Sequence, residues 1–282
     1  MTGYHLSLIS LTGIMIVFAV SLNMIMGLCG QVSLGHAAFY GVGAYVTAMM
    51  SAGGVPTLYA LPVGMLIAGL MGLIVGFASL RVRDDFLAIT TLAVGFLFVG
   101  VVRKSRALGG EFGISGIPES GLGPAGDAFL VAFCVVLTVA LSVYLSRNWT
   151  GLAFRSISAN EEAAQTLGIN SAHYKLLAFC IGCALAGLAG GLYANYARFI
   201  VPGTFGFSLS ITAAAMVVIG GIGSTAGVVA GAVLLTLFPE IFRFLGDYRM
   251  LVYGALLVGV MLFQPKGLAG IPSMVRRWAG PR

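Results

Sequence analysis

Polar side chains within glycine-rich runs are the groups best placed to do chemistry in this chain of 282 residues. The first run, from Gly30 to Gly43, carries Gln31, Ser33 and His36 inside a long apolar stretch. Irregular backbone at membrane depth is tolerated only where it is buried in protein or lines a cavity. These three side chains can therefore hydrogen-bond a passing polar solute, or alternatively satisfy neighbouring helices.

A second glycine-rich run, from Gly220 to Gly231, interrupts another apolar stretch near the C-terminus. We predict that the two runs break their helices and border a path for a small polar solute. Asn23, which precedes the first run, is a weaker candidate of the same kind. The predicted path residues are Asn23, Gln31, Ser33, His36, Gly220, Gly221 and Ser224.

The hydrophilic stretch 147–175 predicts a short helix that lies outside the apolar segments. Asn160 is placed to cap its first turn, which carries Glu161 and Glu162 at the positive end of the helix dipole. Gly168 is placed to end it. We expect about two helical turns, with Ala163 and Ala164 exposed and Ser171 capping the next helix. A helix this short needs a partner for stability.

Composition places these segments in a membrane. Hydrophobic residues make up 59% of the chain and charged residues 9%, against about a quarter charged in soluble domains. No Asp, Glu, Lys or Arg occurs in residues 1–80 or 199–239. Each uncharged run exceeds the roughly 20 residues that one membrane crossing requires. The sequence therefore predicts an all-α polytopic membrane protein with about 8–10 transmembrane helices and glycine-rich broken segments.

The apolar runs predict nine crossings in a single transmembrane domain, 1–282. The positive-inside rule places the loop 147–175 and the C-terminal tail in the cytoplasm, together with 81–85. The stretches 103–126 and 197–207 then face outward. The predicted spans are 6–27, 32–51, 57–80, 86–103, 127–146, 174–196, 208–221, 226–242 and 250–264.

Glycine, at 41 residues, is about twice as frequent as in soluble proteins. Small residues let helix backbones approach closely in lipid, where packing drives association. We expect a tightly packed bundle, with some of this pairing across a subunit interface. The G-x-x-x-G pairs are Gly72 with Gly76, Gly187 with Gly191, and Gly227 with Gly231.

The sequence argues against enzymatic chemistry. It has no paired carboxylates, no Ser-His-Asp set and no cluster of metal ligands, and its three histidines are in unrelated positions. It also lacks the G-x-x-x-x-G-K-[ST] loop that cradles the phosphates of ATP. An ion-coupled secondary transporter or channel is the alternative, but such proteins keep a charged group at midmembrane, and the predicted spans hold none beyond His36.

The short hydrophilic helix resembles a known motif. Glu162, Ala163, Ala164 and Gly168 form an E-A-A-x-x-x-G pattern that looks like the cytoplasmic loop of ATP-binding-cassette (ABC) importer permeases. In that family this loop is the coupling helix, which docks into a groove on the ATPase subunit. The resemblance implies that Glu161, Glu162, Ala163, Ala164 and Gly168 couple this chain to an ATPase.

Other stretches resemble the LivH/LivM permeases of branched-chain amino acid ABC importers. The outward loop at 105–113 is shorter and less rich in Asn and Thr than that family leads us to expect. The matching stretches are Ser21 to Gly27, Gly30 to Tyr45, Gly113 to Pro118, Tyr174 to Phe179, Ala184 to Tyr193, Gly220 to Ser224 and Gln264 to Leu268.

The resemblance implies an assembly in the bacterial inner membrane. A second, LivH-like permease, two ATPase subunits and an extracytoplasmic binding protein would accompany this multi-pass chain, with no nucleic acid. This chain would bind no cofactor, since ATP and Mg would sit on the ATPases. The implied substrates are leucine, isoleucine and valine, with urea or short amides next.

Overall fold

A computed structural model describes residues 3–79, 85–241, 254, 258, 267 and 268 of the chain. The predicted span 250–264, the C-terminal tail, most of the loop 81–85 and most of the Gln264 to Leu268 stretch lie outside the described residues. Within the described part, the chain is almost entirely helical, with one two-stranded pairing. The predicted all-α polytopic fold is confirmed.

Eight of the nine predicted spans coincide with helices to within four residues at each end. The second predicted span, 32–51, corresponds to a helix that begins at His36, and residues 32–35 before it are not helical. The helices are α1 (Gly3–Asn23) with its π-helical turn η1 (Met24–Leu28), α2 (His36–Ala52), α3 (Thr57–Ser79), α4 (Asp85–Lys104), α5 (Gly123–Arg147), α6 (Trp149–Ala159), α7 (Glu161–Thr166), α8 (Ser171–Ala197), α9 (Phe207–Gly220) and α10 (Thr225–Ile241).

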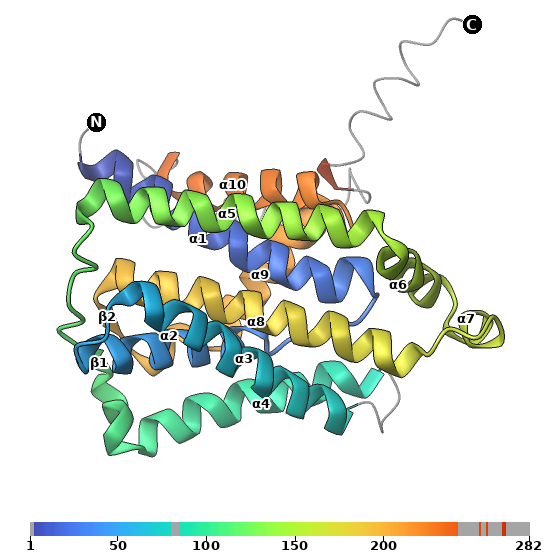
Figure 1. The fold of residues 1–282 in the computed structure, drawn as a ribbon, viewed down its shortest axis with the longest axis horizontal. Helices are drawn as coiled ribbons and strands as arrows, with labels where there is room; N and C mark the ends of the chain where they lie inside the picture. The colour runs from blue at the N-terminus through green and yellow to red at the C-terminus, as the bar shows by residue number, and fades with distance from the viewer. Residues whose placement is uncertain (1–2, 80–84, 242–253, 255–257, 259–266, 269–282) are drawn as a thin grey trace, which may run out of the picture.

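The long helices lie side by side along the long axis of the molecule (Figure 1). Two short strands, β1 (Ile114–Ser115) and β2 (Phe199–Ile200), pair antiparallel at one end. The 3-10 turns η2 (Arg106–Leu108), η3 (Gly110–Phe112) and η4 (Pro202–Phe205) belong to the same connections. Figure 1 places α6 and α7 at the opposite end. The two stretches predicted to face outward therefore meet at one end, and the predicted cytoplasmic helix lies at the other.

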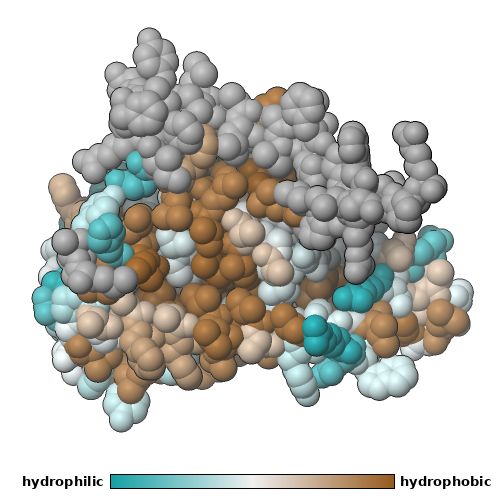
Figure 2. All heavy atoms as spheres, turned by 90° about the horizontal axis from the view of Figure 1, so that it is seen from above, coloured by the Kyte–Doolittle hydropathy of each residue, from teal (hydrophilic) through white to brown (hydrophobic). Residues whose placement is uncertain are grey.

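Burial separates central from peripheral helices. The most apolar window is 78% buried in α1 with η1 and 67% buried in α8, but only 17% buried in α4 and 28% in α5. Large apolar side chains such as Leu97 of α4 and Val136 of α5 are more than half exposed. Figure 2 shows hydrophobic atoms along the middle of one face and hydrophilic atoms towards its ends. This surface fits a bilayer, because lipid leaves exposed apolar side chains without the cost they have in water.

Small residues bring the backbones of α2, α3 and α8 together, as predicted. Gly43 of α2 faces the backbone of Gly187 in α8, and Gly187 in turn faces Ala68 of α3. A Cβ added at Gly72 of α3 would lie 2.5 Å from the Cβ of Cys183 in α8, so Gly72 packs directly against that side chain. The G-x-x-x-G pairs at Gly72, Gly187 and Gly231 thus pack helices of this one chain against each other. The expected role at a subunit interface is not needed to explain them.

Replacing Gly43 with Ala is expected to destabilise the protein, because the added methyl group would overlap the Gly187 carbonyl. Overpacking of this kind costs about 1–3 kcal/mol. The matched control is Gly100→Ala in α4, where nothing lies within 4 Å of an added Cβ; it should be neutral or slightly stabilising. Thermal unfolding of both variants in detergent measures the difference, and equal midpoints would contradict this account of the packing.

Candidate functional site: the α7 end and two glycine breaks

The predicted short helix is present as α7 and is capped as expected. Asn160 Oδ1 accepts a hydrogen bond from Ala163 N at 3.0 Å, and Gly168 follows the helix with a φ of +83°. Glu162 and Ala163 are exposed, but Ala164 is buried, contrary to expectation. Ala164 is buried because α7 packs against α6, so the exposed surface of α7 is formed by fewer residues than predicted.

One local prediction at this end was wrong. The next helix is capped by Asn170, whose Oδ1 accepts from His173 N at 3.2 Å, and not by Ser171, which is its first helical residue. A helix before α7 was also missed from the sequence, since residues 149–159 form α6 with Phe154 and Ile157 buried. The spacing of those two apolar residues, three apart on one helical face, was the signal that could have predicted it.

A partly buried ion pair joins α7 to α8. Lys175 Nζ lies 2.5 Å from Glu161 Oε2, and 6% of the lysine side chain and 31% of the glutamate side chain are exposed. The carboxylate of Glu161 stabilises the charge of the lysine, which is the more buried partner. Its pairing with Glu161 fixes the orientation of α7 relative to the transmembrane helix α8.

The α7 end also exposes large apolar side chains. Leu167, which directly follows α7, is 80% exposed, and Trp149 at the start of α6 is 86% exposed. Together with the exposed carboxylate of Glu162, Leu167 gives this end one charged and one apolar contact point. Such a surface is suited to a protein partner.

The first glycine break separates α1 from α2. The helix ends in the π-helical turn η1, and residues 29–35 follow without helical structure. Side chains of other helices bind the backbone in this segment and at the start of α2: Leu34 N donates to Thr91 Oγ1 at 3.1 Å, and Ala37 N donates to Ser210 Oγ at 3.0 Å. These two amides, which lack a helical partner, have therefore found side-chain acceptors.

The second break separates α9 from α10 and contacts the first. Gly221 and Gly223 have φ values of +106° and +84°, a backbone conformation that favours glycine. Asn23 Oδ1 accepts a hydrogen bond from Gly223 N at 3.0 Å. Ser224 is turned to α10, where its Oγ accepts from Gly227 N at 3.2 Å. Asn23 and the Gly220 to Ser224 run, chosen separately from the sequence, thus meet in one junction.

The predicted polar residues of the first break are buried near this junction. His36 is fully buried, with Nε2 2.8 Å from Ser21 Oγ and its ring stacked on Phe18 at a centroid distance of 5.4 Å. His36 Nδ1, Gln31 Oε1 and Ser33 Oγ have no hydrogen-bond partner among the described residues. These three atoms could therefore bind water or a solute, as could other buried polar atoms of the bundle such as the Tyr40 and Thr47 hydroxyls.

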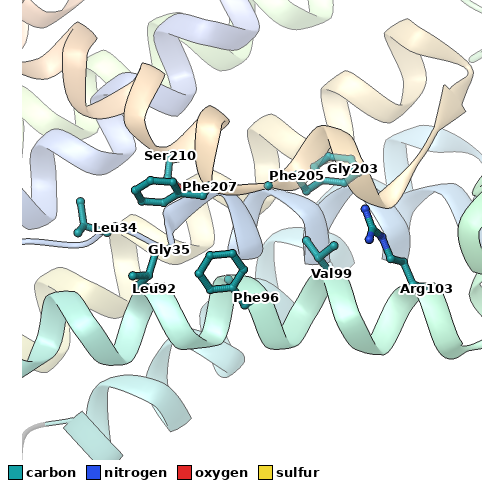
Figure 3. A pocket seen from close by; sticks show the side chains of 12 residues that line it. Leu34, Gly35, Leu92, Phe96, Val99, Arg103, Gly203, Phe205, Phe207 and Ser210 are labelled. Carbon is teal, nitrogen blue, oxygen red and sulfur yellow. The ribbon is translucent and has the colours of Figure 1, made fainter.

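A cavity of about 260 Å³ lies beside the first break (Figure 3). Its walls come from the break itself, from α4, and from η4 with the start of α9. Arg103 of α4 lies at one end of the row of lining side chains, and Leu34 and Gly35 lie at the other. Gln31, Ser33 and His36 do not line it. The cavity instead extends along α4 from the break towards the β1/β2 end.

Comparison with known proteins gives one consistent family. The model of the family described as "Branched-chain amino acid transport system / permease component" matches residues 4–261. The chain is 33% identical to the permease protein LivM of Escherichia coli K12, over 92% of this chain and 68% of LivM. It is 30% identical to BraD of Pseudomonas aeruginosa and 27% identical to LivH of Escherichia coli K12, each over 91% of both chains. No solved structure gives a significant match.

The resemblance seen in the sequence is confirmed by these matches, which extend over nearly all of the chain. They do not favour the alternative of an ion-coupled transporter or channel. The matched region contains both glycine breaks and the α6–α7 segment. The chain belongs to the permease component family of branched-chain amino acid transport systems and is a multi-pass membrane protein.

Proposed function

We propose that this chain is one of two permeases in an ATP-driven importer of branched-chain amino acids in the bacterial inner membrane. The second permease is LivH-like, two ATPase subunits hydrolyse ATP with Mg, and an extracytoplasmic protein delivers the solute. The chain itself binds no cofactor. Relatives named LivM, BraD and LivH are permeases of high-affinity branched-chain amino acid systems, which supports this substrate class ahead of urea and short amides.

The observation that carries the coupling role is the anchoring of α7. This helix projects at one end of the molecule (Figure 1), presents Glu162, is followed by the exposed Leu167, and is tied to α8 by the partly buried pair of Glu161 and Lys175. A helix of six residues has little stability of its own, so the capping and the ion pair hold its position. A push on α7 by an ATPase would therefore be passed to α8.

A second connection leads from α7 to the glycine breaks through α6. Helix α6 packs against η1, and Gly30 lies so close to Ser158 of α6 that a Cβ at position 30 would be 2.8 Å from the serine hydroxyl. Gly30 has a φ of +75° and lies in the non-helical segment 29–35. Movement of α6 with the ATPase would thus reach the junction where Asn23 binds Gly223. In this proposal, the two breaks change shape as the permease opens to one side and then the other.

Substitution of the α7 surface is expected to uncouple ATP hydrolysis from transport. Glu162→Lys reverses the charge of the exposed contact, and Gly168→Val strains the residue at positive φ that follows α7. Loss of an interface anchor costs about 2 kcal/mol, roughly thirtyfold in affinity. Substrate-stimulated ATPase activity and leucine uptake by the reconstituted complex measure the effect.

The control for these variants is Glu111→Gln, which changes an exposed acidic residue of η3 at the opposite end. It should leave coupling unchanged. Normal uptake together with normal ATPase binding in both α7 variants would rule out the coupling role.

Replacing Asn23 with Ala is expected to impair transport through the break junction. The change leaves Gly223 N without its acceptor, at a cost of about 1–3 kcal/mol. We expect leucine uptake to fall roughly tenfold by this loss, while the amount of folded protein is retained. Thr212→Ala is the control, because among the described residues the Thr212 side chain bonds only within its own helix, to Ser208 O. Equal uptake by the two variants would show that the junction does not take part in transport.

A further inference from the structure

A polar cavity of about 330 Å³ lies at the β1/β2 end, away from the glycine breaks. The start of α1, the start of α5 and the end of α8 enclose it, and its polar lining includes Ser7, Ser10, Asp127, Asn195 and Arg198. Asp127 Oδ1 accepts hydrogen bonds from Ser120 and, at 3.2 Å, from Asn195 Nδ2. Within the described ranges Asp127 has no salt-bridge partner. Among the described residues, this carboxylate is therefore hydrogen-bonded but forms no ion pair.

Asn195 supplies a second unused acceptor in this cavity. The residue is only 6% exposed, and its Oδ1 has no hydrogen-bond partner in the part of the chain that the structure describes. A buried amide oxygen without a donor is costly. Asp127 and Asn195 together therefore favour a ligand group that is positively charged and carries N–H donors.

Arg198 adds a positive group to the same cavity. It is the one non-glycine residue with positive φ among those described, at +57°, a conformation that is disfavoured for such residues and that recurs at functional sites. Its guanidinium Nη1 lies 2.5 Å from Glu119 Oε1, and 45% of the arginine side chain is still exposed, so the guanidinium has other N–H donors left for an anion. The cavity offers partners for both charges of a zwitterion.

The polar cavity adjoins an apolar groove of about 470 Å³ between α1 and α5. Val131 lines both, and the groove continues past Ile9, Gly13 and Ile16 of α1 and Val136 of α5. The stretch from Leu8 to Ile16 rises roughly 12 Å, which is close to the depth of one leaflet, about half of a 30 Å hydrocarbon core. Its walls are almost wholly aliphatic, so the groove suits a hydrocarbon chain.

We propose that this composite site binds a phospholipid with a primary ammonium headgroup. The ammonium contacts Asp127 and Asn195 Oδ1, the phosphate contacts Arg198, and one acyl chain lies in the groove between α1 and α5. A free amino acid would satisfy the two charges but would leave the groove empty. A choline headgroup has no N–H donor for Asn195 Oδ1. Under the predicted orientation, the lipid belongs to the outer leaflet.

The test compares lipids bound to the full-length chain. The protein is incorporated into nanodiscs with equal amounts of phosphatidylethanolamine and phosphatidylcholine, extracted gently, and analysed by native mass spectrometry. We expect a preference of roughly fivefold for phosphatidylethanolamine, the value of one favourable ion pair. Asp127→Asn, which keeps an acceptor but removes the charge, should abolish the preference. Glu111→Gln at the same end, outside the cavity, should retain it.

A second pair of variants tests the groove separately. Val136→Trp fills the groove and should reduce the total retained lipid, whereas Leu137→Trp, an adjacent exposed position outside the groove, should not. Binding of both lipids in the proportion offered would overturn the proposal. Displacement of the bound lipid by added leucine would overturn it in favour of an amino acid site. These outcomes do not depend on ATPase coupling, so they are independent of the proposed transport function.

Discussion

The constraint on which this structure depends is that a backbone amide removed from a helix inside a membrane must find another partner. Two helices of this chain are interrupted by glycine-rich segments, and the amides freed there bond to side chains far away in the sequence. Leu34 N bonds to Thr91, Ala37 N to Ser210, and Gly223 N to Asn23. Each bond brings a different helix to the breaks. The helices around α1 are therefore arranged so that they supply hydrogen-bond acceptors to the two breaks.

The rest of the bundle supports this junction by close packing. Helices α2, α3 and α8 meet at Gly43, Ala68 and Gly187, where no larger side chain fits. Contacts of this kind allow little movement, because backbone lies directly against backbone. The α7 segment is attached to this firm part through Glu161 and Lys175. An external force on α7 thus acts on a rigid unit whose nearest adaptable neighbour is the first glycine break.

Local sequence signals predicted the helices and the ends of α7 well. The uncharged apolar runs predicted eight spans that the structure contains. Asn160 and Gly168 predicted the two ends of α7, because capping depends on residues only three or four positions apart. The pairing of Lys175 with Glu161 and of Asn23 with Gly223 was not predictable, since a single sequence shows polar residues but not their partners. Asn23 and Gly223 are 200 positions apart, and only the folded bundle brings them together.

The backbone at the two breaks is held by single bonds to side chains, which indicates where a conformational change can occur. Leu34 N, Ala37 N and Gly223 N each donate to one side chain, whereas α2 and α8 meet backbone against backbone at Gly43 and Gly187. A rearrangement at the breaks would exchange these few bonds for others of the same kind. A rearrangement of α2 against α8 would instead separate backbones in van der Waals contact. The energetics therefore favour motion at the breaks over motion within the packed trio of α2, α3 and α8.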